Sequence, residues 1–546
     1  MRIAKLLVSL LCAGALLAQQ APTFPSPGYF RQHFFTRTPR VELQPPVRFA
    51  DFVSDGKLKL SLRGYLELVL ANNTDIAIEK VSVEVQRNAI TRAFAKFDPT
   101  LELAFSTTRA NSPSSDLLAG AATVSTLTQP GAATYSQLLP TGTDVSVEYG
   151  AQKYTTNSSY ATYNPAISSY LRLGFTQPLL RDRGIYVTKL PVLIARSRLS
   201  ASELGLRDQV IQLLSAAETA YWNVVGAREN LKVQEQSLAL RGAALKRSQD
   251  ELRLGALAPL DIFQPQADYA TAEIQVSQAR FSLAQTEDAL RKQMGADLDP
   301  RFRDLPIELT EGVLPPAETA GIDRESMVSK AIQMRPDLLQ IHQNLATDEL
   351  SIKSATNSLR PDLSLTGRYT SRGRGGNYYF QNSTLEGGTT NAVIPGGIGD
   401  ALSQTFRFNY PTYYMELSLT LPIRDRAASA DYADAVVNKR LDSLRARTTE
   451  QSVRLEVLNA ISQVESSKDS VRLAMVASDL AKKNLEAEQK KYDLGTTVLY
   501  FVLDAQTKLT NAESQLATES INYRRNLLRL FRVTGTLLDE RGVKLQ

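Results

Sequence analysis

A chain of 546 residues, 43% hydrophobic and 22% charged, is too apolar to be disordered and long enough for several ordinary domains or one very elongated one. The formal net charge is only +5, and basic residues are interleaved with acidic ones, so no face suited to nucleic acid stands out. We therefore expect a structured protein with no nucleic-acid partner.

The N-terminus has the pattern of a secretory signal. Arg2 and Lys5 precede the apolar run LLVSLLCAGALLA, and the polar stretch QQAPTFPSP follows it. This predicts a signal peptide over 1–18, because the run is too short for a membrane anchor. Lipid attachment at Cys12 is the alternative, although Leu11 stands where a small residue is expected. If Cys12 leaves with the signal, the mature chain has no cysteine and no thiol chemistry.

Long helices dominate the rest of the chain. Residues 19–57 are rich in proline and aromatic residues and are interpreted as an extended arm. Two segments, 185–252 and 427–493, predict helices roughly 100 Å long at 1.5 Å per residue. Helices of about half that length are predicted over about 58–96, 260–295, 323–358 and 502–533. Two half-length helices placed end to end would match one long helix, which predicts a rod.

Both long segments carry apolar or small residues at alternating steps of four and three, the spacing of a heptad seam. The first seam runs from Leu206 to Leu238 and the second from Val453 to Leu485, and many members are Ala or Ser. Neighbouring helices are expected to approach closely along these seams. An ordinary coiled-coil dimer is the alternative.

The chain also contains an internal duplication. RLGALAPLDIFQPQADYATAE in the first half resembles DLGTTVLYFVLDAQTKLTNAE in the second at an interval of 240 (495 − 255). NNTDI and FDPTLEL resemble MRPDL and LRPDLSL at an interval of 262 (337 − 75). Two matched blocks in the same order indicate a repeat. We predict a first repeat over 58–300, a linker over 301–322, a second repeat over 323–535 and a C-terminal tail over 536–546.

Four segments alternate apolar and polar residues with a period of two, at about 98–108, 168–178, 361–370 and 412–422. Strands of this kind suit a barrel with lipid outside and water inside, and a soluble sandwich edge is the alternative. Because the flanking helices belong to one rod, each half must cross a membrane an even number of times. Residues 133–150 are therefore expected to pair across the turn PTG, either as an outward hairpin or as added strands.

No catalytic centre is predicted. The two histidines, His33 and His342, are far apart in sequence, and HExxH, GxSxG, GxxxxGK[ST] and cysteine clusters are all absent. The GRGG stretch at 373–376 is interpreted as a loop because no helix follows it. The sequence thus predicts no enzyme, no cofactor and no metal site.

In their order and duplication, these segments resemble the TolC-type outer-membrane efflux proteins. The resemblance covers about 58–535 and is carried by LKLSLRGYLELVLANNTDI, MRPDL, FTQPLLRDRG, and the two Leu-Gly turns followed by Asp261 and VLDAQ. It implies a fold that is mainly α with a membrane β-barrel portion. Three chains, with four strands each and about twelve in all, would form a trimeric β-barrel continued by a periplasmic α-helical coiled-coil tunnel.

The resemblance also implies a function and partners. A homotrimer in outer-membrane lipid would act as the passive exit duct of a tripartite efflux or type I secretion system. It would pass small molecules or polypeptides from an inner-membrane pump, with a periplasmic adaptor (membrane fusion) protein. A periplasmic coiled-coil tether without a pore is the alternative.

The two hairpin tips, about 253–260 and 493–500, are the implied functional sites. The resemblance implies adaptor docking at the two Leu-Gly turns, where glycine permits the left-handed conformation. These turns are Leu254-Gly255 and Leu494-Gly495.

The tunnel entrance is implied to lie beside these tips, at Phe501, Asp504 and Asp261. A ring of carboxylates there would favour cations. Phe501 and Thr497 stand where the family can have an aspartate and an arginine, so an apolar constriction at Phe501 is expected instead of a salt-linked one. Capping of the following helix is the alternative role of Asp504.

Overall fold

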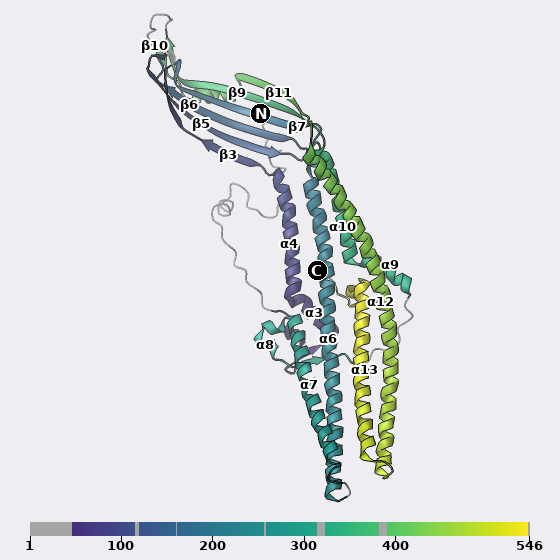
Figure 1. Ribbon diagram of the computed structural model, residues 1–546. Coiled ribbons are helices and arrows are strands. Elements are labelled where there is room, and N and C mark those ends of the chain that lie inside the picture. Colours follow the sequence, from purple (N-terminus) through teal and green to yellow (C-terminus); the bar gives the residue numbers. More distant parts are fainter. Residues whose placement is uncertain are drawn as a thin grey trace. The chain divides into compact units, whose positions relative to one another are not determined.

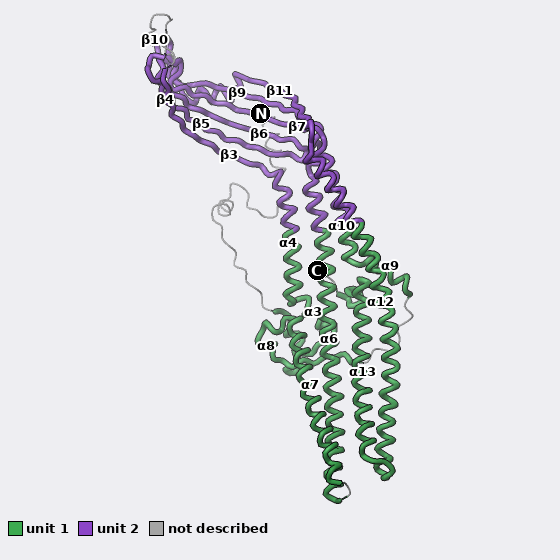
Figure 2. Tube along the Cα trace, viewed as in Figure 1, with its two compact units in different colours: residues 1–85, 200–343, 444–546 green, residues 86–199, 344–443 purple. Residues whose placement is uncertain are grey.

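A computed structural model describes residues 46–114, 119–159, 161–255, 258–313, 323–381 and 390–543. The predicted signal peptide, most of the proline-rich arm and part of the linker lie outside these ranges. The described residues divide into two compact units (Figure 2). Unit 1 takes those within 1–85, 200–343 and 444–546, and unit 2 takes those within 86–199 and 344–443.

The elements follow the chain as labelled in Figure 1. The helices are α3 Leu62–Asn72, α4 Thr74–Phe94, α5 Ile185–Thr188, α6 Leu190–Arg253, α7 Phe263–Met294, α8 Pro300–Arg303, α9 Arg324–Met334, α10 Pro336–Ser358, α11 Ile398–Phe406, α12 Arg426–Asp493, α13 Leu499–Val533 and α14 Leu537–Glu540. The strands are β1 Val53–Ser54, β2 Lys57–Leu60, β3 Thr100–Phe105, β4 Thr108–Pro113, β5 Thr123–Leu138, β6 Asp144–Thr156, β7 Tyr163–Pro178, β8 Ile307–Leu309, β9 Asp362–Gln381, β10 Thr390–Ile394 and β11 Tyr410–Thr420.

The two long helices predicted from the seams are α6, with 64 residues, and α12, with 68. Val210, Ala217 and Val224 of the first seam are fully buried, as are Val453 and Val457 of the second. The seams therefore bury the faces expected of them. Within unit 1, α12 packs its seam against α9 and α13 in one apolar cluster.

Two predicted half-length helices are broken, and both breaks fall in the duplicated NNTDI and MRPDL motifs. The helix expected over 58–96 divides at Asn73, whose side-chain oxygen accepts hydrogen bonds from the backbone of Asp75 and Ile76. The helix expected over 323–358 divides at Arg335, which is extended because Pro336 follows it. The repeated motif is thus a repeated helix break.

The large sheet lies in unit 2 and has the order β10-β9-β7-β6-β5-β3, with β11 on β9 and β4 on β5. All of its pairings are antiparallel. Residues 133–150 add strands: β5 and β6 pair from Leu138↔Asp144 to Thr126↔Thr156 and lie between β3 and β7. The eight strands of this sheet therefore form six lines in the described part of the chain, instead of the predicted four strands. This count takes β3 and β4 as one line along β5, and β10 and β11 as one line along β9.

The sheet has one apolar and one polar face. Directly paired residues share a face, so the registers place each strand's alternating positions on a common side. The exposed apolar face includes Leu101, Leu103, Phe105, Val147, Leu173, Phe175, Tyr413, Met415, Leu417 and Leu419. The opposite face carries the charged and hydroxyl side chains, among them Glu148, Arg172, Thr176, Arg368 and Glu416.

The prediction of a loop at GRGG is wrong. Residues 373–376 belong to β9, and α11 packs directly on them. A Cβ at Gly373 would collide with the backbone carbonyl of Ala401, so glycine is needed for this close approach. Hydrogen bonds from Ser371 to the carbonyl of Thr405 (2.7 Å) and between Ser169 and Thr405 (2.7 Å) hold the helix in place.

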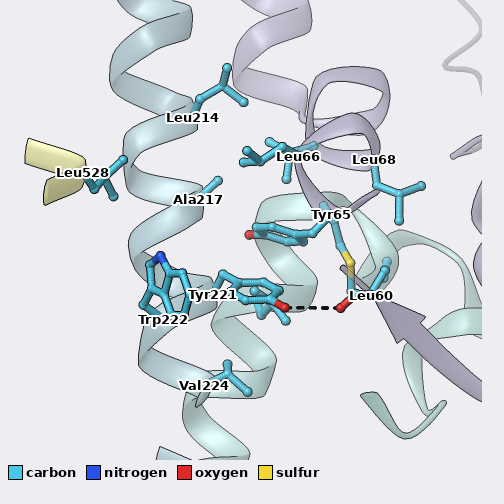
Figure 3. Packing of buried hydrophobic residues seen from close by; sticks show 14 of the residues in the cluster. Leu60, Tyr65, Leu66, Leu68, Leu214, Ala217, Tyr221, Trp222, Val224 and Leu528 are labelled. Atoms are coloured by element: carbon cyan, nitrogen blue, oxygen red, sulfur yellow. Dashed lines mark hydrogen bonds between the residues drawn. The ribbon is translucent and has the colours of Figure 1, made fainter. Parts of the chain in front are cut away.

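The core of unit 1 gathers around α6 (Figure 3). Tyr65 of α3 and Tyr221 of α6 are fully buried, with ring centroids 5.7 Å apart. The hydroxyl of Tyr221 donates to the carbonyl of Leu60 on β2 (3.3 Å). Strand β2 lies between β1 and β8 in a small sheet that the sequence did not predict.

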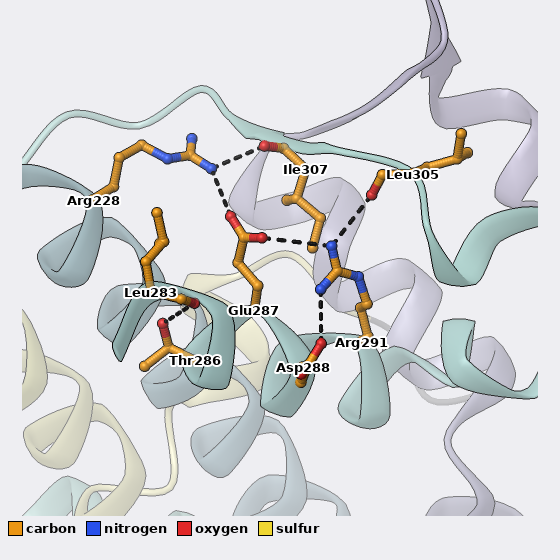
Figure 4. A network of polar contacts seen from close by, with 8 residues as sticks. All are labelled: Arg228, Leu283, Thr286, Glu287, Asp288, Arg291, Leu305 and Ile307. Atoms are coloured by element: carbon orange, nitrogen blue, oxygen red, sulfur yellow. Dashed lines mark hydrogen bonds and ion pairs between the residues drawn. The ribbon is translucent and has the colours of Figure 1, made fainter. Parts of the chain in front are cut away.

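A polar network fixes the segment that leads into β8 (Figure 4). Arg228 of α6 donates to the carbonyl of Ile307 (2.9 Å) and contacts Glu287 of α7 (3.5 Å). Arg291 contacts the same carboxylate (3.5 Å) and donates to the carbonyl of Leu305 (3.4 Å). The small sheet is thereby tied to both helices of the first hairpin.

Candidate functional site

Each helical hairpin of unit 1 reverses at a Leu-Gly turn. Gly255 and Gly495 have φ of +76° and +73°, the left-handed conformation that the sequence predicts. The amide of Gly255 donates to the carbonyl of Leu252, and that of Gly495 to the carbonyl of Tyr492. These bonds end α6 at Arg253 and α12 at Asp493. Residues 256–257 of the first tip lie outside the described ranges.

The leucines of these turns project into solvent. Leu254 and Leu494 are each 79% exposed, and Leu260 and Phe263 of the first tip are 78% and 62% exposed. A Cβ at either turn glycine would meet nothing within 4 Å. Both tips therefore offer open, apolar surfaces with no occupant in the described chain.

Phe501 and Asp504 lie together on α13, just beyond the second tip. Phe501 is 51% exposed, and its ring packs edge-on against Tyr500 with centroids 5.6 Å apart. The carboxylate of Asp504 pairs with Lys508 one turn further along (2.7 Å). The alternative of a helix cap is wrong for Asp504, because the cap position is occupied by Val498 and α13 begins at Leu499.

Asp261 does not occupy a matching place. It lies in the turn that precedes α7, which begins at Phe263, whereas Asp504 lies inside α13. With the interval of 240, α13 begins where residue 259 stands in the first repeat (499 − 240), so the first turn is four residues longer. The three predicted entrance residues are thus divided between the two hairpins.

An interaction network that the sequence did not predict joins the two hairpins beside their tips. Arg247 of α6 forms an ion pair with Asp493 of α12 (2.7 Å), and its guanidinium lies 4.5 Å from the ring centroid of Tyr492. Tyr492 donates a hydrogen bond to Glu251 of α6 (2.8 Å), and Glu251 also pairs with Arg247 (3.0 Å). Four side chains therefore connect α6 with α12, and the two partners of the ion pair, Arg247 and Asp493, are 246 positions apart in sequence.

The protonation states of this network follow from its contacts. The hydrogen bond from Arg247 lowers the pKa of Asp493 below its ordinary value, so this carboxylate stays ionised. Burial and the hydrogen bond to Glu251 raise the pKa of Tyr492 to about 12. The ordinary tyrosine value is about 10. The phenol therefore keeps its proton and donates, and the network holds its charges at neutral pH.

Two further findings concern chemistry and the membrane. In the ranges that the structure describes, no group of three or more His, Cys, Asp or Glu side chains is placed to hold a metal ion. His342 lies on α10, and His33 is outside those ranges. No described helix combines the length and the apolar character that crossing a bilayer requires.

Comparisons with known proteins find similarity to outer-membrane proteins. The sequence model described as outer membrane efflux protein matches residues 327–536. Outer membrane protein TolC of Vibrio cholerae is 25% identical over 354 residues, which span 63% of this chain and 71% of that protein. Outer membrane protein TolC of Escherichia coli is 27% identical over 341 residues, which span 61% of this chain. They span 63% of that protein, which is less than two thirds of its length.

Similarity of fold extends over most of the chain. A solved structure of a membrane protein from Pseudomonas aeruginosa superposes with a TM-score of 0.59 over 91% of this chain and 96% of that chain. The two sequences are 20% identical, so this match concerns the fold. The stretch matched by the family's sequence model contains the second tip, Phe501 and Asp504.

Proposed function

We propose that this chain, a TolC-type outer-membrane efflux protein, acts as a passive exit duct in the outer membrane. The observation that carries the proposal is the two-faced antiparallel sheet of unit 2. An exposed apolar face with a charged opposite face is what a sheet needs between lipid and water. A soluble tether would gain nothing from exposing Leu103, Phe105 and Met415 on one side.

Three copies are proposed to close the duct. Within the described residues, β3 and β4 form one edge of the sheet, and β11 forms part of the opposite edge. Each of these strands is paired on one side only. Unpaired edges are too costly in lipid, so a neighbouring copy must satisfy them. Because six antiparallel strands lie in sequence, β3 and β11 run in opposite directions, and β11 of one copy can continue antiparallel onto β3 of the next.

The closed sheet would be wider than the sequence predicted. Six strands from each of three copies give a barrel of 18 strands (3 × 6). The sequence predicted four strands from each copy and a barrel of about twelve. Barrels of roughly 16–18 strands leave an aqueous channel. The added hairpin of β5 and β6 accounts for the difference.

The hairpin tips are proposed to bind the partners. Leu254 and Leu494, held outward by Gly255 and Gly495, present apolar side chains that a periplasmic adaptor protein would cover. An inner-membrane pump would deliver cargo through that adaptor. The open space around both glycines supports a docking role, because nothing in the described chain fills it.

The entrance is proposed to lie at Phe501 and Asp504. Three copies would bring three phenyl rings and three carboxylates toward one axis, where the rings restrict flow and the carboxylates favour cations. Asp261 would add charge from the neighbouring hairpin. In each copy, the ion pair with Lys508 partly offsets the negative charge of Asp504.

Conductance separates a duct from a tether. Purified protein reconstituted in planar bilayers is expected to give discrete, ohmic channel openings, since the closed sheet encloses water. The family is one of transport ducts, and no enzymatic activity is proposed. Protein that inserts, resists extraction with alkali and yet never conducts in any variant of the entrance would favour the tether.

A further inference from the structure

The polar face of β9 carries a row of arginines. Arg368, Arg372 and Arg374 share one face because strand side chains alternate, and all three are exposed. The register places Arg372 opposite Tyr170 and Arg374 opposite Ser168 on β7. Successive positions on this face are about 6.8 Å apart, so Arg372 and Arg374 are neighbours on it.

Glu148, an acid on the same face of the sheet, is already engaged. Glu148 accepts a hydrogen bond from Tyr170 (2.6 Å) at one carboxylate oxygen and an ion pair from Arg172 (2.6 Å) at the other. By contrast, Arg372 and Arg374 form no ion pair with any acid in the part of the chain that the structure describes. Their positive charge is therefore not neutralised from within the described sheet.

These arginines line a concavity. A pocket of about 830 Å³ is bounded by Tyr163, Tyr170, Arg172, Arg372 and Arg374, among others. The guanidinium of Arg374 lies 4.4 Å from the ring centroid of Tyr163, which orients it. The volume lies within the range of small-molecule sites, about 300–1,000 Å³.

An adjoining copy would leave the pocket open. Its main strands, β7 and β9, are interior strands, each paired on both sides within one chain. A second copy would add at β3 or β11 and so extend the sheet rather than cover this face. Helix α11 packs against Ser371 and Gly373, and its Gln404 borders the pocket, where it accepts a hydrogen bond from the backbone amide of Arg374 (3.0 Å).

We propose that this pocket is a binding site for small organic anions that carry carboxylate or phosphate groups. Paired guanidiniums bind such groups with charge-assisted, bidentate hydrogen bonds, and the two phenols favour anions that also carry a ring. The inference rests on the proposed duct function and names a class of ligand that the wall of the duct would bind.

The test measures how strongly two anions block the current through the open channel. Benzene-1,3,5-tricarboxylate represents the carboxylates, and pyrophosphate represents the phosphates. The double variant Arg372→Gln/Arg374→Gln is expected to weaken both blocks about tenfold or more, because each lost charged contact is strong. Arg368→Gln removes one positive charge from the same face of the same strand, outside the pocket, and is the matched control for the single variants Arg372→Gln and Arg374→Gln. It should change the block less than about twofold, and Arg372→Lys/Arg374→Lys should lie between.

Equal loss of block in Arg368→Gln and the double variant would overturn the site in favour of a general field effect. Unchanged block in the double variant would overturn it outright, and the single variants serve if the double one fails to assemble. Calorimetric titration of the same anions into detergent-solubilised protein separates the two proposals. A conducting channel without binding refutes the site alone, whereas binding without conductance refutes the duct alone.

Discussion

Arg247 and Asp493 form an ion pair of 2.7 Å that joins the long helix of the first hairpin to the long helix of the second, close to both tips. The pair is half-exposed, so it contributes little to the stability of the fold. Its position suggests a different role. It restrains the separation of the two hairpins at the end where the entrance is proposed.

Arg247→Ala is therefore expected to raise the basal conductance of the isolated channel several-fold while leaving the thermal midpoint nearly unchanged. Single-channel recording and thermal unfolding in detergent measure the two effects. Arg253→Ala is the control, because within the described ranges Arg253 forms its ion pair with Asp250 of its own helix and with no other acid. Equal conductance in both variants would show that the ion pair does not restrain the entrance.

The tip glycines are expected to matter for export and not for assembly. Gly255→Val and Gly495→Val each impose the left-handed conformation on a β-branched residue, at a cost of about 1–2 kcal/mol, and so distort the docking turn. Because a new Cβ meets nothing within 4 Å, the remainder of the chain should be undisturbed. Export assays in cells, with trimer content measured in parallel, check this.

Asparagine gives the matched control at these positions, since it adopts the left-handed conformation more readily than valine. Gly255→Asn and Gly495→Asn should keep most of the export activity. Normal export by both valine variants would remove the argument for docking at these turns.

Phe501 and Asp504 are expected to act differently on flow. Phe501→Ala should raise basal conductance at a stability cost below about 0.5 kcal/mol, because the ring is 51% exposed within one chain. Asp504→Asn should mainly lower cation selectivity, and Lys508→Gln should raise it by releasing the carboxylate. Reversal potentials in a salt gradient measure selectivity. Unchanged conductance in the first variant and unchanged selectivity in the other two would refute the entrance as placed.

A substitution that adds one methyl group can test the close approach of α11 to β9. Gly373→Ala would force its Cβ against the carbonyl of Ala401 and should destabilise the protein by about 1–3 kcal/mol. Gly399→Ala, on α11 itself, places a Cβ where nothing lies within 4 Å and should be neutral or stabilising. Similar thermal midpoints for the two variants would mean that α11 does not pack as described.

The long helices and the tip turns were predictable because their signals are local and repeated. A heptad seam over dozens of residues identifies α6 and α12, and a Leu-Gly pair at the same place in both repeats identifies their ends. The helix breaks at Asn73 and Arg335 were not predicted, although an asparagine that can bond to its own backbone and a proline after Arg335 are local signals for a break.

Other features needed the folded chain. Strand β5 contains the run TQPGAATYSQL, whose small residues blur the alternation, so its place in the sheet follows only from its pairing. Glycine is needed at position 373 because α11 packs against it, and that helix begins 25 residues later in the chain (398 − 373). The link between Arg247 and Asp493 spans 246 positions, and no local pattern brings such residues together.

Three six-stranded sheets are proposed to close into one duct, and cross-linking of the sheet edges can detect that closure. Leu103→Cys on β3 is combined in turn with Met415→Cys, Leu417→Cys or Leu419→Cys on β11, in a mature chain expected to have no other cysteine. Oxidation in the membrane should convert at least one pair into a covalent trimer with no larger species, because a closed ring of three has no free edge. A ladder of higher oligomers, or covalent dimers alone in every pair, would mean that the sheets do not close into a ring of three.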